Sequence, residues 1–212
     1  MNNNWAGLIF DGSKESIDYV QNQDFYWQHD LTAVYAWINR ENINELIADN
    51  GYTGDLGILS IDIDGNDYWV WEKIEVVNPI IVIVEWNSVF GLDHAISIPY
   101  DPDFQRTKAH YSNLFWGASI AAFSHLAERK GYFLLGSNTA GNNLFFVRHD
   151  RLGRLMPLSP KKAYIESLFR DSRDINGTLN FLSREQRRME ILDMSIIDVT
   201  NGSYTTMRKL GR

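Results

Sequence analysis

Short apolar runs that end at acidic, amide or turn-forming residues recur along the first two thirds of the chain. This pattern predicts buried strands at residues 5–10, 31–38, 56–63 and 80–86. Capping residues and helical spacing predict helices that begin near Lys14, after Asn39, near Tyr68 and at Ser112. Because strands alternate with helices, we expect an α/β fold with a Rossmann-like, mostly parallel sheet and helices on both faces.

The end of this alternating pattern differs from its beginning. Strands are predicted at residues 132–135 and 144–147, joined by the turn-rich sequence GSNTAGNN, which is typical of an antiparallel hairpin. Beyond Arg148 the pattern weakens, with helices expected over 163–169 and 184–194 and a loose tail from about Thr200. We therefore divide the chain into an α/β domain, 1–148, and a helical extension, 149–212, packed on the domain or between subunits.

Composition narrows the functional classes. The 212 residues include no cysteine, which excludes thiolate chemistry, and no apolar run approaches the roughly 20 residues that span a bilayer. The net charge of −7 disfavours nucleic-acid binding, and no leader is recognised, so we expect a cytoplasmic protein without a membrane span. Residues 148–212 carry 13 Lys/Arg against 8 Asp/Glu. This surplus is typical of a solvated helical face, and a partner surface, a subunit contact and a phosphate-bearing substrate are the alternatives.

The sequence IDIDGND follows the third predicted strand. Asp62 and Asp64 alternate and should share a face at the strand end, with Asn66 close behind. The set resembles a calcium loop but has Asp67 and Lys73 where such a loop requires glycine and glutamate. Three interpretations stay open: a site for a divalent cation such as Mg²⁺, one aspartate that binds or deprotonates a substrate hydroxyl while the other caps a helix, and capping alone.

Further candidates follow the fourth predicted strand. Glu85 ends five consecutive aliphatic residues, so burial should raise its pKa and suit it to acid–base chemistry, although a structural carboxylate is an equal alternative. Asn87 begins an irregular stretch, 87–110, that we expect to cover a site as a loop or lid. His94 and His110 lie in or beside this lid and are candidate substrate-binding and base residues.

Taken together, several segments resemble the class I S-adenosylmethionine-dependent methyltransferases of the FkbM type. The matching pieces are WAGLIFDGS, AWINRENINELI, LSIDIDGNDYWVWE, IVIVEWNSVFG, HYSNLFWGAS and GYFLLGSNTAGNNLFFVR, which together span residues 5–148. The IDIDGND piece is the most specific of them. The resemblance implies methyl transfer from S-adenosylmethionine to a hydroxyl of a sugar, glycan or other small polar metabolite.

The resemblance also assigns roles to residues. Asp11 matches the acid that binds the cofactor ribose, and Ala36, Trp37 and Asn39 lie where the adenine is flanked. The acids and amides after the third and fourth strands would line the pocket beneath the methyl group: Asp62, Asp64, Glu85 and Asn87.

One part of the family pattern has no match. The family's first strand, glycine-rich turn and first helix normally precede the strand that matches residues 5–10, and the sheet would lack its central strand without them. We consider a fragment, a shortened member that serves as a non-catalytic binding or assembly module, and a homo-oligomer that completes its sheet by exchange. A metal-dependent hydrolase or lyase built on Asp62, Asp64 and Glu85 is a further alternative.

Overall fold

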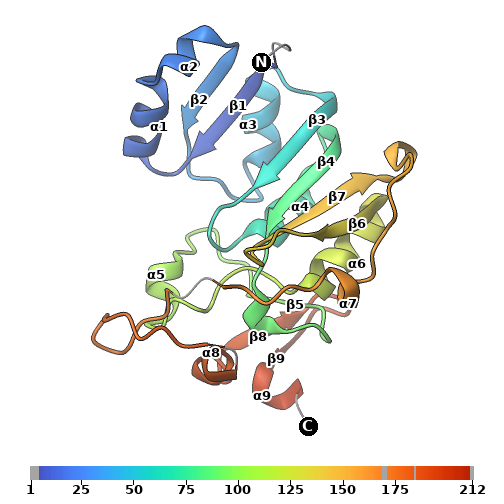
Figure 1. Cartoon of the computed structure of the whole chain (residues 1–212). Helices are drawn as coiled ribbons and strands as arrows, with labels where there is room; N and C mark the ends of the chain where they lie inside the picture. The colour runs from blue at the N-terminus through green and yellow to red at the C-terminus, as the bar shows by residue number, and fades with distance from the viewer. Residues whose placement is uncertain (1–4, 169–170, 184, 211–212) are drawn as a thin grey trace.

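A computed structural model of the chain describes residues 5–168, 171–183 and 185–210. The strands within these ranges form sheets of two, four and three members. The fold is mixed α/β, with parallel strands, flanking helices and an antiparallel hairpin late in the α/β region, as the sequence predicted (Figure 1).

The two-stranded sheet is formed by β1 (Gly7–Asp11) and β2 (Leu31–Tyr35), which pair in parallel. Between them lie α1 (Lys14–Gln21) and α2 (Asp24–Gln28). Ser13 caps α1 by accepting a hydrogen bond from the backbone N–H of Ser16, as the DGS sequence predicted.

The four-stranded sheet has the order β3 (Gly54–Ile61), β4 (Val77–Glu85), β7 (Asn143–Arg148) and β6 (Tyr132–Ser137). β3 and β4 are parallel, whereas β7 is antiparallel to both of its neighbours. The predicted hairpin is therefore confirmed. Its turn is held by Asn138, whose side-chain oxygen accepts hydrogen bonds from three successive backbone N–H groups, those of residues 141–143.

Helices α3 (Ile43–Asp49), α4 (Asp67–Lys73) and α6 (Ile120–Lys130) contribute apolar side chains to the main core beside the four-stranded sheet. Trp71 of α4 packs between Phe123 of α6 and Phe146 of β7, with ring centroids 6.2 and 5.0 Å apart. Burial of these rings is a large apolar contribution to stability. It fixes α4 directly behind the ends of β3 and β4.

α6 is shorter than the sequence suggested, so the prediction of a helix from Ser112 is wrong. Residues 112–118 form a loop in which Asn113 and Gly117 adopt positive φ values of 64° and 66°. The helix begins after Ser119, whose hydroxyl accepts from the N–H of Ala122. It ends at Gly131, as predicted, because that residue adopts the left-handed conformation.

A third, antiparallel sheet joins the lid to the end of the chain. Its order is β5 (Ile96–Ser97), β8 (Ser195–Asp198) and β9 (Ser203–Thr206). The prediction of a loose tail is wrong, because β9 and α9 (Met207–Leu210) are ordered parts of the fold. Met207 is 1% exposed and packs in a second apolar cluster with Ile96 and Ile196.

The remaining elements are short. They are η1 (Ser88–Phe90), α5 (Arg106–Ala109), η2 (His149–Arg151), α7 (Pro160–Ala163) and α8 (Glu185–Glu190). The prediction of a helix over 163–169 is wrong in its described part, because α7 ends at Ala163 and residues 164–168 are irregular. The helix predicted over 184–194 is confirmed as α8 for residues 185–190 only. Residues 169 and 184 lie outside the described ranges. Within those ranges, every helix is too short or too polar to cross a membrane.

Replacement of Ser119 by alanine should destabilise the protein more than replacement of Ser13. The Ser119 hydroxyl accepts from Ala122 and Ile96 and donates to the carbonyl of His94, all in a buried position. We expect S119A to lower the free energy of unfolding by about 1–3 kcal/mol and S13A, at an exposed cap, by about 0.5–1 kcal/mol. Chemical denaturation measures both, and equal losses would contradict the central role given to this cap.

Candidate functional site

The carboxyl ends of β1 and β3 open onto one cleft of about 610 Å³. Parallel α/β sheets place their ligands at this edge. The lining residues come from the segments after β1, β2 and β3 and from the lid: Phe10, Asp11, Gly12, Ser13, Trp37, Ile38, Asp62, Ile63, Asp64, Asn66, Phe104, Gln105, Arg106, Thr107 and Asn113.

Only two of the four residues expected to bind a cofactor line the cleft. Asp11 and Trp37 line the cleft, whereas Ala36 and Asn39 do not. One carboxylate oxygen of Asp11 accepts from the N–H of Ser13 at 2.6 Å, and the Trp37 indole N–H donates to the carbonyl of Pro102 at 2.8 Å. Asn39 accepts from the backbone N–H groups of Glu41 and Asn42, so its side chain shapes the turn before α3.

The turn after β3 is held by Asp67, a residue that the sequence analysis did not assign to the site. Its carboxylate is fully buried and accepts hydrogen bonds of 2.9 Å from the N–H groups of Ile63 and Gly65. Gly65 permits close approach of the lid, since a Cβ atom there would lie 2.2 Å from the Phe104 ring. Asp64 adopts a φ of 58°, which costs about 1–2 kcal/mol for a residue with a side chain.

This geometry assigns the stabilisation of the turn, which we expected from Asp62 or Asp64, to a different residue. Asp67 does the work of stabilising the turn, while Asp62 and Asp64 line the cleft. Asn66 also lines it and is 4% exposed. Its amide N–H donates to the carbonyl of Asp101 at 2.7 Å, and its side-chain oxygen has no hydrogen-bond partner.

Arg106 of α5 ties the lid to the rest of the site. Its guanidinium donates to Asp64 at 3.1 Å, to Asp171 at 2.5 Å and to the carbonyl of Asn113 at 3.0 Å. It also lies over the Trp116 ring, 4.6 Å from the centroid. A single cation therefore joins the turn after β3, the lid and the carboxyl-terminal extension.

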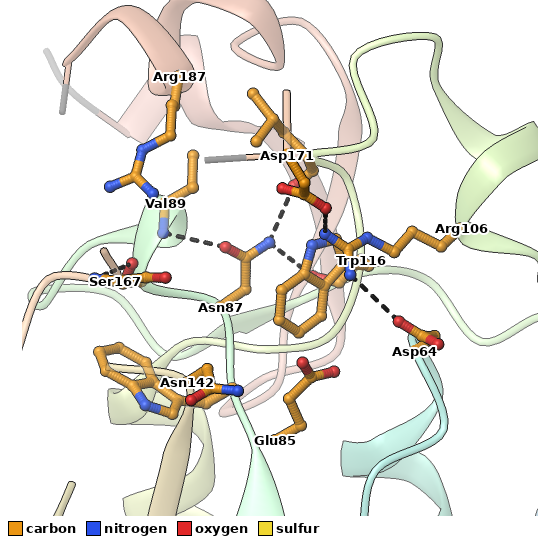
Figure 2. A pocket seen from close by; sticks show the side chains of 13 residues that line it. Asp64, Glu85, Asn87, Val89, Arg106, Trp116, Asn142, Ser167, Asp171 and Arg187 are labelled. Atoms are coloured by element: carbon orange, nitrogen blue, oxygen red, sulfur yellow. Dashed lines mark hydrogen bonds and ion pairs between the residues drawn. The ribbon is translucent and has the colours of Figure 1, made fainter. Parts of the chain in front are cut away.

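Behind this ion pair lies an inner hollow of about 190 Å³, shown in Figure 2. Asp64 and Arg106 line both the cleft and the hollow, so their pair forms part of the wall between them. Glu85, at the end of β4, also lines the hollow, which confirms that adjacent strands bring Asp64 and Glu85 to one edge of the sheet. Asn87 also lines the hollow, but its side chain is already hydrogen-bonded within the protein. Its NH₂ group donates to the carbonyls of Leu114 and Trp116, and its side-chain oxygen accepts from the N–H of Val89.

The acidic side chains around the hollow shift one another's pKa values. Burial, followed by the charges of Asp67, Asp62 and Asp64, raises the pKa of Glu85 to about 9, and one of its carboxyl oxygens has no hydrogen-bond partner. Burial and the Asp64 charge raise the pKa of Asp62, while a hydrogen bond with Glu85 lowers it. Burial and the neighbouring negative charges thus favour the neutral form of the Glu85 carboxyl group.

The two candidate histidines line neither the cleft nor the inner hollow. The ring of His110 contacts the Ser112 hydroxyl at 2.7 Å and stacks on Tyr111. Burial lowers the pKa of His110, and the charge of Glu190 opposes this effect. His94 precedes β5, and its carbonyl accepts from Ser119.

The proposed metal site gains no support from the geometry. Across the described ranges, no group of three or more His, Asp or Glu side chains is placed to hold a metal ion. Asp64 instead pairs with Arg106, and Asp62 with Glu85.

Several important residues were missed by sequence reasoning. Arg106 lies in the segment expected to form a lid, where it and Lys108 are the only Lys or Arg residues, so a basic pair in a lid beside an acidic sequence was the available signal. Asp171 and Trp116 gave no comparable signal, because they reach the site only through the packing of distant segments.

Comparison with known proteins gives no relative: no protein-family model, curated protein or solved structure matches this chain.

Glu85→Gln should reduce the pH dependence of stability. Because the pKa of Glu85 is raised in the folded state, the folded protein retains a proton that the unfolded chain loses, and stability falls as pH rises from about 4.5 to about 9. One such group contributes a slope of at most about 1.4 kcal/mol per pH unit. Denaturation of the wild type and E85Q at pH 5, 6, 7 and 8 should show a smaller slope in the variant.

A matched control is Glu75→Gln, which removes one carboxylate from an exposed position. We expect E75Q to keep the wild-type slope. Parallel curves for the wild type and E85Q would contradict the assignment of a raised pKa to Glu85. Some pH dependence of stability should remain in E85Q, because burial also raises the pKa of Asp67, to about 7.

Proposed function

We propose that this protein is an S-adenosylmethionine-dependent methyltransferase with a Rossmann-like fold that acts on a hydroxyl of a sugar or other small polar metabolite. The observation that carries the proposal is the convergence of Asp11, Trp37 and Asp62 on a single cleft at the carboxyl edge of parallel strands. Their order along the chain matches the order that the family resemblance implies.

The cleft offers suitable groups for the nucleoside part of the cofactor. Asp11 uses one carboxylate oxygen within the chain, and its second oxygen can accept hydrogen bonds from ribose hydroxyls. The Trp37 ring is 45% exposed and offers an aromatic face to a purine. Asn66 supplies an unpaired, buried carbonyl oxygen at the same cleft.

Asp62 and Glu85 provide the acid–base pair in this proposal. S-adenosylmethionine, held by Asp11 and Trp37, would supply an activated methyl group for an acceptor hydroxyl, and Asp62 would take the proton that this hydroxyl loses. Asp62 is the base in this proposal, because its carboxylate lines the cleft and because burial and the Asp64 charge raise its pKa, which makes it a stronger proton acceptor. Glu85 is therefore a positioning residue that holds the Asp62 carboxylate by a hydrogen bond.

A second candidate is a non-catalytic binding or assembly module. It is favoured by a specific observation: the two groups of parallel strands are separated by an apolar groove, so the sheet beside the cleft is incomplete. Cofactor binding is the property that distinguishes the two candidates.

S-adenosylhomocysteine should stabilise the protein if the proposal is correct. A ligand present at one hundred times its Kd raises the free energy of unfolding by about 2.7 kcal/mol. Thermal melting with increasing S-adenosylhomocysteine measures this effect. Asp11→Asn should weaken binding by roughly tenfold or more, since it removes the charge expected to contact the ribose hydroxyls.

Asp49→Asn, at an exposed position on α3, is the matched control and should bind like the wild type. The absence of any melting shift at saturating ligand would exclude the methyltransferase and favour the binding module. If Mg²⁺ or Mn²⁺ alone raised the melting temperature instead, the metal-dependent alternative would replace both.

A further inference from the structure

A groove of about 820 Å³ separates β1 from β3. Within the described ranges, β1 pairs with β2 and β3 pairs with β4, so each strand has an unpaired edge. Residues of both strands line the groove, which therefore lies between these two edges. In Figure 1 the arrows of β1 and β3 point in the same direction.

Apolar side chains line the groove. They come from both strands and from the helices beside them, including Ile43 and Ile47 of α3 and Val70 and Ile74 of α4. Asp62, at the end next to the cleft, is the one charged residue among the lining side chains. An occupant must therefore be uncharged along most of its length, because burial of an unpaired charge is costly.

The strands that flank the groove show an unusual pattern of exposure. Val82 of β4 is fully buried, whereas Leu59, its partner on β3, is only partly covered, and Ile58 of β3 is 42% exposed. All five residues of β1 are likewise half-buried. The Trp5 ring lies against Gly57, where an added Cβ atom would come within 3.2 Å, and yet Trp5 is 58% exposed.

We propose that the groove binds an extended segment of a partner polypeptide, which adds one strand between β1 and β3. Two edges of unpaired backbone groups favour a peptide over a lipid or other apolar small molecule, because only a peptide supplies N–H and C=O groups to both edges at regular spacing. The segment should be apolar at least at every second position, where its side chains face α3 and α4.

The described residues cannot themselves supply this strand. Each described strand already has its place in one of the three sheets. A strand that spans β1 or β3 needs about five to eight residues, or roughly 17–26 Å of extended chain.

The added strand would also complete the cleft. Phe10, Ile38, Asp62 and Ile63 line both the groove and the cleft, so one end of the strand would enter the cleft beside Asp62. This inference stands without the proposed function, since strand binding and cofactor binding are measured separately.

Hydrogen exchange detected by mass spectrometry tests the proposal. The probes are nine-residue peptides in which Val, Ile or Leu alternates with Thr between terminal lysines. We expect the best of them, at millimolar concentration, to slow exchange of the β1 and β3 amides by about tenfold or more. The edge strand β6 should be unaffected.

Two controls make the result specific. A peptide with Pro in place of each Thr keeps the apolar side chains but removes alternate N–H donors, and it should give no protection. Ile58→Lys places a charge in the groove at a partly exposed position and should abolish protection by the first peptides. Tyr204→Lys, at an exposed position of β9, is the matched control and should leave the protection unchanged. Circular dichroism should show that both variants are folded.

Three outcomes would overturn the proposal. The first is no protection of either strand by any peptide in the panel. The second is equal protection by the proline peptide, which would indicate a general apolar pocket. The third is protection that grows with protein concentration in the absence of peptide, together with a dimeric mass, which would make a second copy of this chain the occupant.

Discussion

The two hydrogen bonds that the buried Asp67 carboxylate accepts from Ile63 and Gly65 are the interaction on which the site depends. They close the turn after β3 and hold Asp64 in a left-handed conformation that its side chain disfavours. The same turn brings Gly65 against Phe104 of the lid. Without this carboxylate, two N–H groups would lose their partner, and the acids of the turn would lose their common orientation.

Arg106 extends this constraint across the molecule. Its ion pairs with Asp64 and Asp171 connect the turn to the carboxyl-terminal extension, and its contact with Trp116 fixes the loop before α6. The side chain is only 13% exposed, so breaking either pair would leave a poorly solvated charge. The lid and the extension are therefore parts of the site's architecture as well as its cover.

The site concentrates negative charge beside an incomplete sheet. Burial and the charges of three neighbouring aspartates raise the pKa of Glu85 and so favour its neutral form, while a hydrogen bond with Glu85 lowers the pKa of Asp62. The apolar groove between β1 and β3 ends at Asp62. Asp62 therefore belongs both to the proposed acid–base chemistry in the cleft and to the proposed strand-binding groove. The two proposals share this residue but are tested by separate measurements.

Local patterns in the amino-acid sequence were enough to predict most of the strands of the α/β region and the edge of the sheet that carries acids. Apolar runs that end in polar residues predicted β1, β3 and β4, and capping residues predicted α1, because these signals depend on neighbours a few positions apart. The same local rules failed at Ser112 and in the tail. There the outcome was decided by distant contacts, the amide of Asn87 with the loop before α6 and the burial of Met207 in the second core.

Only the tertiary structure decided which polar residues act together. It placed Asp11, Trp37 and Asp62 around one cleft, excluded His94 and His110 from it, and brought Arg106 and Asp171 into contact although they lie 65 positions apart. It also separated the strands around a groove, where the sequence indicated only that a central strand had no match. The physical reason is that pairing of strand edges and neutralisation of buried charge depend on proximity in space, which no local pattern encodes.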